Sequence, residues 1–485
     1  MALSFPLSTT HTINRFLLAS ALLLLCLFLL SALFLPRRSS PSPFSLSFDL
    51  SLPPPPSSPP PPPPPPSLYH PPPLSAPLGL SLWVPGTSDG AGPREVDDGI
   101  TSLPEPAVWE PEPEAETGRD AAESREGRPT GRREGKCDLF HGRWERDEEG
   151  WYPLYSPGSC PYVDEAFSCQ ENGRPDRDYL KWRWKPKDCD LPRFNAADFL
   201  ERLRGKRLML VGDSMNRNQY ESLLCLLHEA LPNKSKMYET RGNRITKGRG
   251  YFIFKFVDYN CTVEFVRSHF LVREGKRVNR QGSSPTLAID HIDKSAHRWK
   301  RADILVFNTG HWWTHGKTAR GKNYYQEGDV LYPQFDAIEA FRRAMRTWGK
   351  WIDNNMDPAR KLVFYRGYSA AHFRGGDWDS GGTCNGETDP ISTGALLDSY
   401  PLKMKIVEEV IRKMHFPVIL LNVTKLTNFR KDGHPSIYGK TRTQGQKVSK
   451  RKQDCSHWCL PGVPDSWNEL IYFSLVLAQT MHLAK

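Results

Sequence analysis

The sequence predicts a doubly wound α/β domain, in which a parallel sheet is covered by helices on both faces. Four short apolar runs have the length and composition of buried strands, and stretches with apolar residues at helical spacing lie between them. This alternation is typical of parallel sheets. Ser214, Asn308 and Arg366 each follow one of the apolar runs. Because reactive groups gather at the carboxyl ends of such strands, we expect a functional site there.

The N-terminal segment has the features of a retained membrane anchor. Arg15 precedes about twenty mostly apolar residues, Phe16–Leu35, and Pro36-Arg-Arg follows them. At 1.5 Å per residue a helix of this length spans a bilayer. No clear small-residue cleavage site follows, so a signal-anchor is favoured over a cleaved signal peptide. We therefore expect a transmembrane segment over residues 16–35.

Features downstream of this segment decide its orientation, because positive charges flank it on both sides. Sequons for N-glycosylation occur at Asn233, Asn260 and Asn422, and all cysteines except Cys26 lie after the apolar segment. Glycans and disulfides both belong to the secretory pathway. We expect a single-pass type II membrane protein with residues 1–15 in the cytosol. The nine downstream cysteines are an odd number, so one should stay unpaired or bond outside the chain.

Residues 36–136 are predicted to form a disordered stalk. The polyproline runs Pro53–Pro56 and Pro59–Pro66 are stiff and extended and do not enter a core. The charged segment that follows has almost no apolar periodicity. A proline-rich ligand for a partner protein is the alternative interpretation. A spacer that holds the globular part away from the membrane is preferred.

From Cys137 the sequence is rich in cysteines, aromatic residues and turns. Segments such as Cys160-Pro-Tyr and Tyr179-Leu-Lys-Trp-Arg-Trp are typical of a small disulfide-stapled module, which we expect over residues 137–190. Its Trp and Arg side chains either pack on the next domain or bind the face of a sugar. Packing is the preferred interpretation.

The α/β domain is expected over residues 191–485, with each element drawn from a local pattern. The expected strands are Leu208–Val211, Ile304–Phe307, Leu362–Tyr365 and Val418–Leu421. The expected helices are Ser214–His228, Gln334–Trp351, Leu397–Met414 and Trp467–His482. The segment Phe252–Phe265 has the pattern of an inserted hairpin.

The stretch Gly212-Asp213-Ser214 breaks the first apolar run and starts the first expected helix. At such a turn a serine hydroxyl is exposed, and free N–H groups of the helix start point toward it. This arrangement suits a nucleophile beside an oxyanion. By itself the tripeptide is also ordinary turn chemistry, with a plain helix N-cap as the alternative.

A second motif, Asp454-Cys-Ser-His457, lies on a segment too rich in Cys, Pro and Gly for a long helix. One tight turn would place both side chains on the same side, so that Asp454 holds the His457 tautomer and the other ring nitrogen accepts a proton from Ser214. Two nearby cysteines would fix this loop. A surface hydrogen-bonded pair or half of a metal site is the alternative.

Asn308 is predicted to donate to an oxyanion, alongside the backbone N–H of Ser214. Two further histidines compete with His457 for the role of base. No carboxylate lies close to His311 in the sequence, so it is interpreted as a structural or substrate-side residue. His372 is the other competitor.

Three further residues are candidates for substrate binding. Trp312 and Trp313 are either core residues or a platform on which a sugar stacks. Arg217, one turn into the first helix, either holds the donor, orients Asp213 or lies on the helix surface, and the same alternatives hold for its neighbour Asn218.

Charge and composition limit the partners. The formal net charge of +10 favours a negatively charged polysaccharide or another acidic partner. The basic run Lys440–Lys452 either steers such a glycan or is a solvated loop. No zinc-finger spacing, RNA-binding aromatic signature or Arg-rich recognition helix occurs, so nucleic acid is a poor candidate. The cysteines lack Cys-x-x-Cys pairs with partner histidines, so neither a metal nor a cofactor is expected.

Together the Gly-Asp-Ser and Asp-x-x-His motifs resemble those of the trichome-birefringence-like proteins of plants, relatives of the powdery-mildew-resistance proteins. The resemblance runs from Cys137 to the C-terminus. It also covers Cys169-Gln-Glu-Asn-Gly-Arg-Pro-Asp, Trp182-Arg-Trp, Asn308-Thr-Gly-His-Trp-Trp and Gly381-Gly-Thr-Cys384. It implies an SGNH-hydrolase-like lobe with a smaller N-terminal lobe, in the Golgi membrane.

The resemblance also implies transfer of acetyl groups onto hydroxyls of cell-wall polysaccharides such as xylan, mannan, xyloglucan or pectin. By position it makes Ser214 the nucleophile, His457 the base and Asp454 its orienting carboxylate. The acetyl donor, for example acetyl-CoA, is then a co-substrate. Two other hypotheses remain open: an acetylesterase with the same triad, and a non-catalytic protein that binds wall polysaccharides.

Overall fold

The computed structural model describes most of the chain after residue 137. The described residues are 138–187, 189–279, 282–377, 380–391, 400–440, 449 and 453–483. The expected anchor and stalk lie outside them, as does most of the basic run before Gln453. Among the helices of the described part, none is long and apolar enough to cross a membrane.

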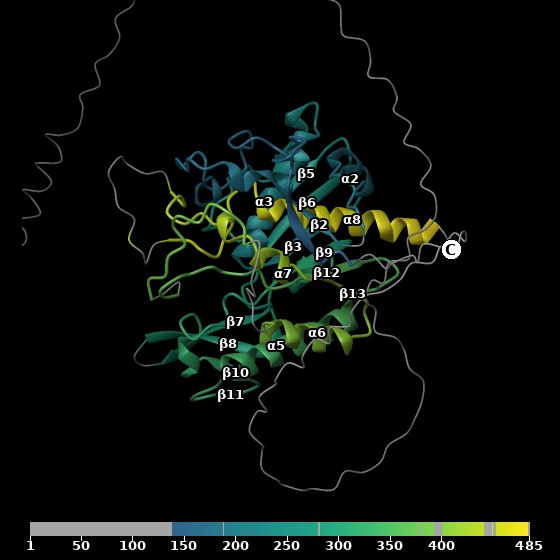
Figure 1. The fold of residues 1–485 in the computed structure, drawn as a ribbon. Helices are drawn as coiled ribbons and strands as arrows, with labels where there is room; N and C mark the ends of the chain where they lie inside the picture. The colour runs from purple at the N-terminus through teal and green to yellow at the C-terminus, as the bar shows by residue number, and fades with distance from the viewer. Residues whose placement is uncertain are drawn as a thin grey trace, which may run out of the picture. The chain divides into compact units, whose positions relative to one another are not determined.

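A seven-stranded sheet forms the centre of the α/β domain (Figure 1). In spatial order its strands are β13 (Val418–Leu421), β12 (Leu362–Arg366), β9 (Ile304–Phe307), β3 (Arg207–Gly212), β6 (Cys261–Arg267), β5 (Tyr251–Phe256) and β4 (Met237–Glu239). The first five are parallel to one another, whereas β5 and β4 pair antiparallel with their neighbours. The expected wholly parallel sheet is therefore corrected to a mixed one.

The hairpin of β5 and β6 belongs to this sheet and is not an insertion. β6 pairs with β3 along its length, with Leu208 opposite Val263 and Val211 opposite Val266. The alternating pattern of β5 is local and predicts a hairpin. The pairing with β3 joins distant parts of the chain, so no local pattern predicts it.

Strand order marks the place of the functional site. Numbered along the chain, the five parallel strands lie in the order 2-1-3-4-5, so the connections diverge from β3 and β9. In open α/β sheets, ligands bind outside the carboxyl ends of the strands at this switch point. Ser214 directly follows β3 and Asn308 directly follows β9.

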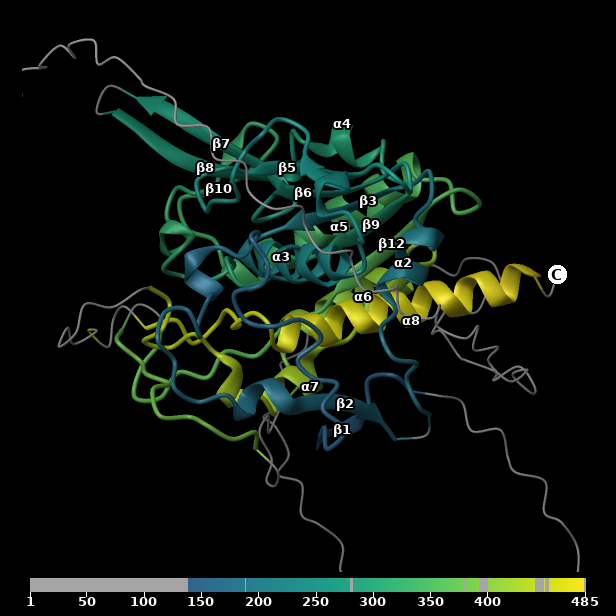
Figure 2. The same cartoon turned by 90° about the horizontal axis from the view of Figure 1, so that it is seen from above.

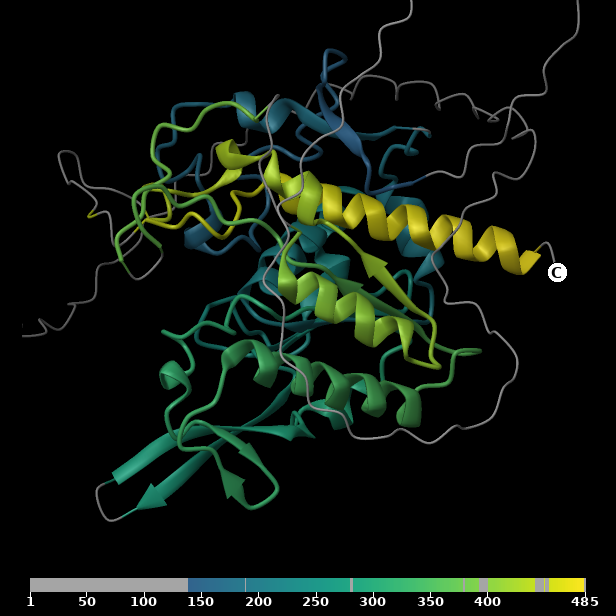
Figure 3. The same ribbon diagram turned by 60° about the horizontal axis from the view of Figure 1, so that its bottom comes forward.

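Helices cover both faces of the sheet, as Figures 1 and 3 show. One face carries α3 (Ser214–Glu229) and α8 (Val463–Leu483), and the other carries α5 (Ala337–Asn355) and α6 (Leu402–Arg412). β3 contributes to both cores: Leu208 and Leu210 join the first, and Met209 and Val211 join the second. Since all four side chains are fully buried, each contributes about 1.5–3 kcal/mol to the free energy of folding.

α3 begins at the end of β3 and is buried almost all round. Asp213 is its N-cap and accepts a hydrogen bond from the Met215 N–H at 2.9 Å. Residues 215–228 are all buried, because α8 packs against the helix on the side away from the sheet. The predicted amphipathic helix is therefore a central one, which gives Ser214 a rigid support.

A second sheet that the sequence analysis did not predict flanks α5. Its strands, in spatial order, are β11 (Val330–Leu331), β10 (Tyr325–Glu327), β8 (Gly282–Ile292) and β7 (Val272–Asn279). β7 and β8 form a long hairpin that extends away from the other strands in Figure 2. Most of its outer residues are charged or polar and exposed, so they lack the apolar alternation that identifies a strand.

The N-terminal module is small and is bonded to the α/β domain. Its only regular sheet in the described residues pairs β1 (Gly142–Arg146) with β2 (Trp182–Pro186). Two disulfides join the module to the larger domain, Cys160–Cys225 and Cys169–Cys459. These bridges cross between the two parts, and Cys189 of the module is disulfide-bonded as well. Cys261 is a free, buried thiol.

Two carboxyl groups of α8 are buried where the N-terminal module packs on it. Tyr152 donates a hydrogen bond to Glu469, and Tyr155 donates one to Asp465 at 3.3 Å. Burial raises the pKa of both carboxyls to about 7, because the charged form loses its hydration. The interface is therefore most stable when these groups are protonated.

We expect the free energy of unfolding to fall as pH rises from about 4 to about 7. A pKa raised in the folded state means that the folded chain keeps protons that the unfolded chain has lost, and this contribution disappears above the folded pKa of about 7. Urea unfolding should give a free energy of unfolding that is lower at pH 8 than at pH 5 by about 2 kcal/mol or more. We expect this difference to be smaller in Glu469→Gln and in Asp465→Asn. Glu148→Gln is the control, because Glu148 is exposed, and it should keep the wild-type difference between pH 5 and pH 8. The same difference in all variants would show that Asp465 and Glu469 are not its source.

Candidate active site

Ser214 lies at the first position of α3 and is the one partly exposed residue between buried neighbours. Its backbone N–H stands outside the intrahelical ladder and faces the space beside the hydroxyl. The turn requires Gly212, because a Cβ there would lie 1.9 Å from Asn308 Oδ1. Close packing of two strand ends therefore explains the glycine.

Ser214, His457 and Asp454 form a continuous chain of hydrogen bonds. The Ser214 hydroxyl lies 2.7 Å from His457 Nε2, and His457 Nδ1 lies 2.7 Å from Asp454 Oδ2. Burial by itself raises the pKa of Asp454, but the charge and hydrogen bond of His457 outweigh it and hold that pKa well below its usual value. The carboxylate therefore accepts the Nδ1–H, which leaves Nε2 free to take the serine proton.

The loop that carries Asp454 is fixed on several sides. Oδ1 of this carboxylate accepts hydrogen bonds from the backbone N–H groups of Ser456 and His457 and from the Ser456 hydroxyl. The disulfides Cys384–Cys455 and Cys169–Cys459 anchor the loop next to these residues. The geometry of the base is therefore set before any ligand arrives.

A clamp that the sequence analysis missed joins this loop to the helix of Ser214. Asn218 accepts a hydrogen bond from the Trp458 N–H at 2.8 Å and donates one to the Trp458 carbonyl at 3.1 Å. Since Asn218 lies one turn after Ser214 and Trp458 follows His457, the clamp fixes nucleophile and base relative to each other. Its only signal in the sequence is a polar residue in the buried stretch of a helix.

Asn308 is bonded to the turn that carries Ser214. Its side chain is fully buried, donates to Asp213 Oδ1 at 2.8 Å and accepts from the Asp213 N–H at 3.2 Å. The amide is therefore bound to the turn that holds Ser214. Asn308 therefore positions the nucleophile. Its amide has a second N–H, so the expected role as a donor to an oxyanion stays a prediction, as does that of the Ser214 backbone N–H.

Buried charged groups lie behind this turn. Asp213 Oδ2 has no hydrogen-bond partner among the described residues and lies 3.9 Å from His311 Nδ1. Burial lowers the pKa of His311 to about 4, that of Arg366 to about 10 and that of Lys403 to about 8, while the charge of Asp213 opposes each shift. Two cations, Arg366 and Lys403, therefore lie near the single carboxylate of Asp213 in a mostly buried region.

His311 is a structural residue and does not face a substrate. Its ring stacks on Tyr368 with centroids 4.3 Å apart, and its Nε2–H donates to the Ser369 carbonyl at 3.0 Å. The sequence left two interpretations of His311 open, a structural residue and a substrate-side residue. Packing inside the domain decides for the structural one.

Of the two tryptophans, Trp313 belongs to the core and Trp312 is partly exposed. Trp313 is 1% exposed, and its indole N–H donates to the Thr309 hydroxyl at 2.9 Å. Of the two alternatives for Trp313, a core residue or a sugar platform, its burial therefore decides for the core. Trp312 stacks on His269 with centroids 3.9 Å apart, and the Lys317 ammonium lies 5.0 Å from its ring.

Arg217 is bound at the interface with the N-terminal module. Its guanidinium contacts Glu221 Oε1 at 2.6 Å and Asp164 Oδ2 at 3.1 Å, and it lies over the Phe167 ring. The side chain is 7% exposed. These contacts correct the expected substrate role, because a buried and paired guanidinium is not free for a ligand.

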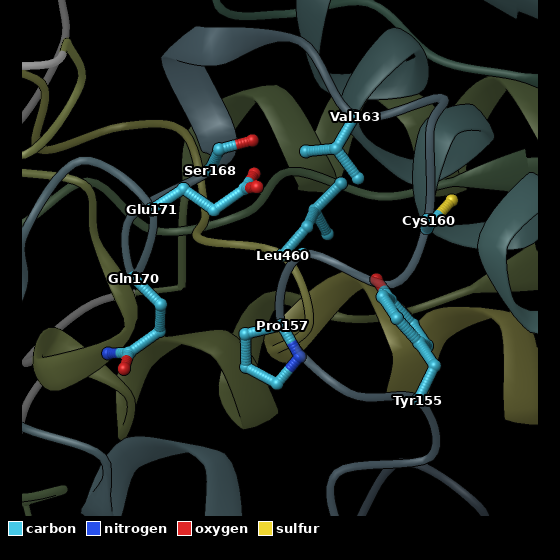
Figure 4. A pocket seen from close by; sticks show the side chains of 9 residues that line it. Tyr155, Pro157, Cys160, Val163, Ser168, Gln170, Glu171 and Leu460 are labelled. Carbon is cyan, nitrogen blue, oxygen red and sulfur yellow. The ribbon is translucent and has the colours of Figure 1, made fainter.

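A small hollow at the interface with the N-terminal module is separate from the hydrogen-bonded chain of Ser214, His457 and Asp454. Figure 4 shows side chains that line it, from the N-terminal module and from Leu460. Neither Ser214, His457 nor Asp454 belongs to its lining. Across the described residues, no group of three or more His, Cys, Asp or Glu side chains is arranged to hold a metal ion.

Comparison with known proteins identifies the family. Residues 191–474 match the PC-Esterase family, described as a GDSL/SGNH-like acyl-esterase family found in Pmr5 and Cas1p. This chain belongs to the PC-Esterase family. Residues 135–190 match the PMR5 N-terminal domain. The PC-Esterase assignment gives the α/β domain its SGNH-like character and supports acyl-ester chemistry in general, meaning acyl transfer or ester hydrolysis.

Among relatives, the chain is similar to three proteins of Arabidopsis thaliana. It is 53% identical to protein trichome birefringence over 70% of this chain and 56% of the relative. For trichome birefringence-like 1 the values are 52%, 70% and 62%, and for trichome birefringence-like 6 they are 51%, 72% and 73%. The predicted resemblance is confirmed, although the match spans less than two thirds of the first two relatives.

Proposed function

We propose that this protein is an O-acetyltransferase that transfers acetyl groups to hydroxyls of cell-wall polysaccharides. The observation that supports it most is the chain from Ser214 through His457 to Asp454, with both contacts at 2.7 Å. It is the arrangement that activates a serine for attack on an acyl group. The family assignment supports acyl-ester chemistry, and the net charge of +10 favours an acidic glycan as acceptor.

In the proposed first half-reaction, Ser214 Oγ attacks the carbonyl carbon of an acetyl donor such as acetyl-CoA. The hydroxyl proton passes to His457 Nε2, and Asp454 stabilises the imidazolium that forms. The tetrahedral intermediate collapses, the bond to the donor breaks, and the leaving group takes the proton from His457. The product is an acetyl-serine ester, and the Ser214 backbone N–H donates to the oxyanion of the tetrahedral intermediate that precedes it.

In the second half-reaction a sugar hydroxyl takes the place of the leaving group. His457 removes its proton as the hydroxyl oxygen attacks the acetyl-serine, and the proton returns to Ser214 Oγ when the ester bond breaks. The glycan leaves with the acetyl group. Transfer prevails over hydrolysis if the bound glycan excludes water from the ester. The partly exposed Trp312 supports a stacking contact for that glycan.

An acetylesterase is the second candidate, because the matched family is described as acyl-esterases. It uses the same acetyl-serine and differs only in that water accepts the acetyl group. The non-catalytic hypothesis has less support, since a polysaccharide tether does not need a serine activated by a histidine and a carboxylate.

One experiment distinguishes the three hypotheses. The purified protein is incubated with acetyl-CoA and defined xylan, mannan, xyloglucan and pectin oligosaccharides, and acetylation is followed by mass spectrometry. We expect acetyl gain on one class of oligosaccharide, and loss of that gain in Ser214→Ala by at least about 10³-fold. Loss of acetyl groups from pre-acetylated oligosaccharides without any gain would favour the esterase. Equal behaviour of wild type and Ser214→Ala would contradict both enzymatic hypotheses.

For the cellular setting we propose a type II protein of the Golgi membrane with the α/β domain in the lumen. The support is the apolar segment Phe16–Leu35 in the sequence and the disulfides in the described residues, which fit an oxidising compartment. Protease protection of the tagged protein in isolated Golgi vesicles tests this location.

A further inference from the structure

Two histidines outside the proposed triad lie directly behind His457. His372 is in the loop after β12, and His434 follows the short turn Lys431–Gly433. His434 is 2% exposed and its ring stacks on Trp458 with centroids 4.1 Å apart. The proposed mechanism uses neither ring, so their burial beside the base needs its own explanation.

Each ring donates a hydrogen bond to a backbone carbonyl. His434 Nδ1 lies 2.6 Å from the His457 carbonyl oxygen, and His372 Nε2 lies 3.0 Å from the Asn428 carbonyl oxygen. A carbonyl oxygen only accepts, so both of these nitrogens must carry a hydrogen. A neutral imidazole has a single N–H, and in each ring that hydrogen is then already placed.

The two remaining nitrogens face each other. His372 Nδ1 lies 2.7 Å from His434 Nε2, which is the distance of a hydrogen bond between them. With both rings neutral, two lone pairs would oppose each other at this distance. One additional proton removes the conflict, and the pair then carries three ring protons and a single positive charge.

The surroundings of the pair act on its charge in both directions. Burial lowers the pKa of both rings, and the neighbouring His372 and His457 lower that of His434 further. The carboxylates of Asp432 and Glu387 act on His372 in the opposite sense and favour its charged form, and Asp454 does the same for His434. The N–N contact is therefore the observation that requires a proton between the rings, and two full charges on the pair are disfavoured.

Basic groups nearby are already bonded to partners of their own. Arg430 pairs with Asp432, and Arg374 and Lys431 both pair with Glu387. A third arginine, Arg174, donates to the backbone carbonyls of Asp432 and His434. These cations offset much of the attraction that Asp432 and Glu387 exert on the pair, so the charge of the pair is limited to the one proton that the N–N contact requires.

We propose that His372 and His434 share one proton as a cationic pair that positions His457 through its backbone carbonyl. The pair adds a hydrogen bond to the His457 carbonyl, next to the Trp458 backbone that the Asn218 clamp holds. When the shared proton is lost, the N–N contact becomes repulsive, His434 turns or moves, and the His457 carbonyl loses its donor. The two histidines are positioning residues, and the base then depends on a protonation step outside the triad.

The shared proton is tested without any activity assay. The full chain is produced with ¹⁵N-labelled histidine, and imidazole nitrogens and their protons are observed by NMR over a pH series. We expect one strongly downfield proton that couples to nitrogens of two different rings and that disappears in both His372→Asn and His434→Phe. Two neutral rings without a bridging proton at any pH where the protein is folded would overturn the proposal.

The effect on the base rests on the proposed function and is tested by the pH dependence of kcat. His372→Asn supplies a neutral amide N–H to His434 Nε2, so we expect kcat within a few-fold of wild type at the optimal pH. In wild type kcat should fall at the pH where the bridging proton is lost, and this fall should be absent in His372→Asn. His434→Phe keeps the stacking on Trp458 but removes the hydrogen bond to His457, and we expect kcat to fall about 10-fold or more with little change in KM.

His415→Asn is the matched control, because its side chain is 95% exposed. It should keep the wild-type dependence of kcat on pH. If His372→Asn also keeps the wild-type profile, the pair does not position the base and the proposal fails. If no acetyl transfer or hydrolysis is found for wild type, the proposed function fails, and the NMR result still decides whether the proton is shared.

Discussion

Asp454→Asn is expected to lower kcat about 10⁴-fold, with little change in KM. Three donors surround Oδ1 of Asp454: two backbone N–H groups and the Ser456 hydroxyl. In the variant the amide oxygen must take this position, so the NH₂ group faces His457 Nδ1. The ring then carries its hydrogen on Nε2 and cannot accept the proton of Ser214. Steady-state kinetics with the acetyl donor measure the loss.

Ser456→Ala is the matched control for this prediction. It removes one of the three donors to Oδ1 but leaves the carboxylate to accept from His457, so kcat should stay within about 10-fold of wild type. A loss in Asp454→Asn no larger than that in Ser456→Ala would show that the carboxylate does not select the tautomer of the base.

Removal of the Cys169–Cys459 bridge is expected to cost about 5 kcal/mol of unfolding free energy. The bridge closes a loop with a sequence separation of 290, so it restricts the unfolded chain strongly. It also holds the chain two residues after His457. The double variant Cys169→Ala with Cys459→Ala should therefore unfold at lower denaturant and show a kcat lower by about 10-fold.

The second bridge between the module and the α/β domain is the control. Cys160–Cys225 has a sequence separation of 65 and joins α3 at Cys225, about three turns after Ser214. Its removal should cost about 4 kcal/mol and leave kcat unchanged at temperatures where the variant is folded. If both double variants lost activity in proportion to stability alone, the Cys169–Cys459 bridge would have no separate effect on the base.

Much of the fold was predictable because helices and parallel strands leave local patterns. The expected strands before Ser214 and Asn308 agree with β3 and β9 to within one residue at each end. The β7–β8 hairpin was missed because its strands are exposed and polar. The partner of β6 was missed because pairing with β3 depends on residues far away in the sequence.

The candidate site shows the same division. Gly212-Asp213-Ser214 and the Asp454/His457 pair were singled out because their chemistry and spacing are unusual by themselves. For Arg217 and Trp313 the alternatives stayed open, since the sequence shows that a guanidinium or an indole is present but not what covers it. Arg217 is buried by carboxylates of two elements, and Trp313 by the core around β9.

By itself the sequence determined which groups are capable of chemistry and which local structures carry them, because both depend on residue type and on neighbours along the chain. Only the tertiary structure decided that Ser214 and His457, 243 residues apart, lie within hydrogen-bond distance. It also decided that Asn308 bonds to Asp213 and that His372 faces His434. The physical reason is that burial and hydrogen-bond partners are set by long-range packing, which a local pattern does not record.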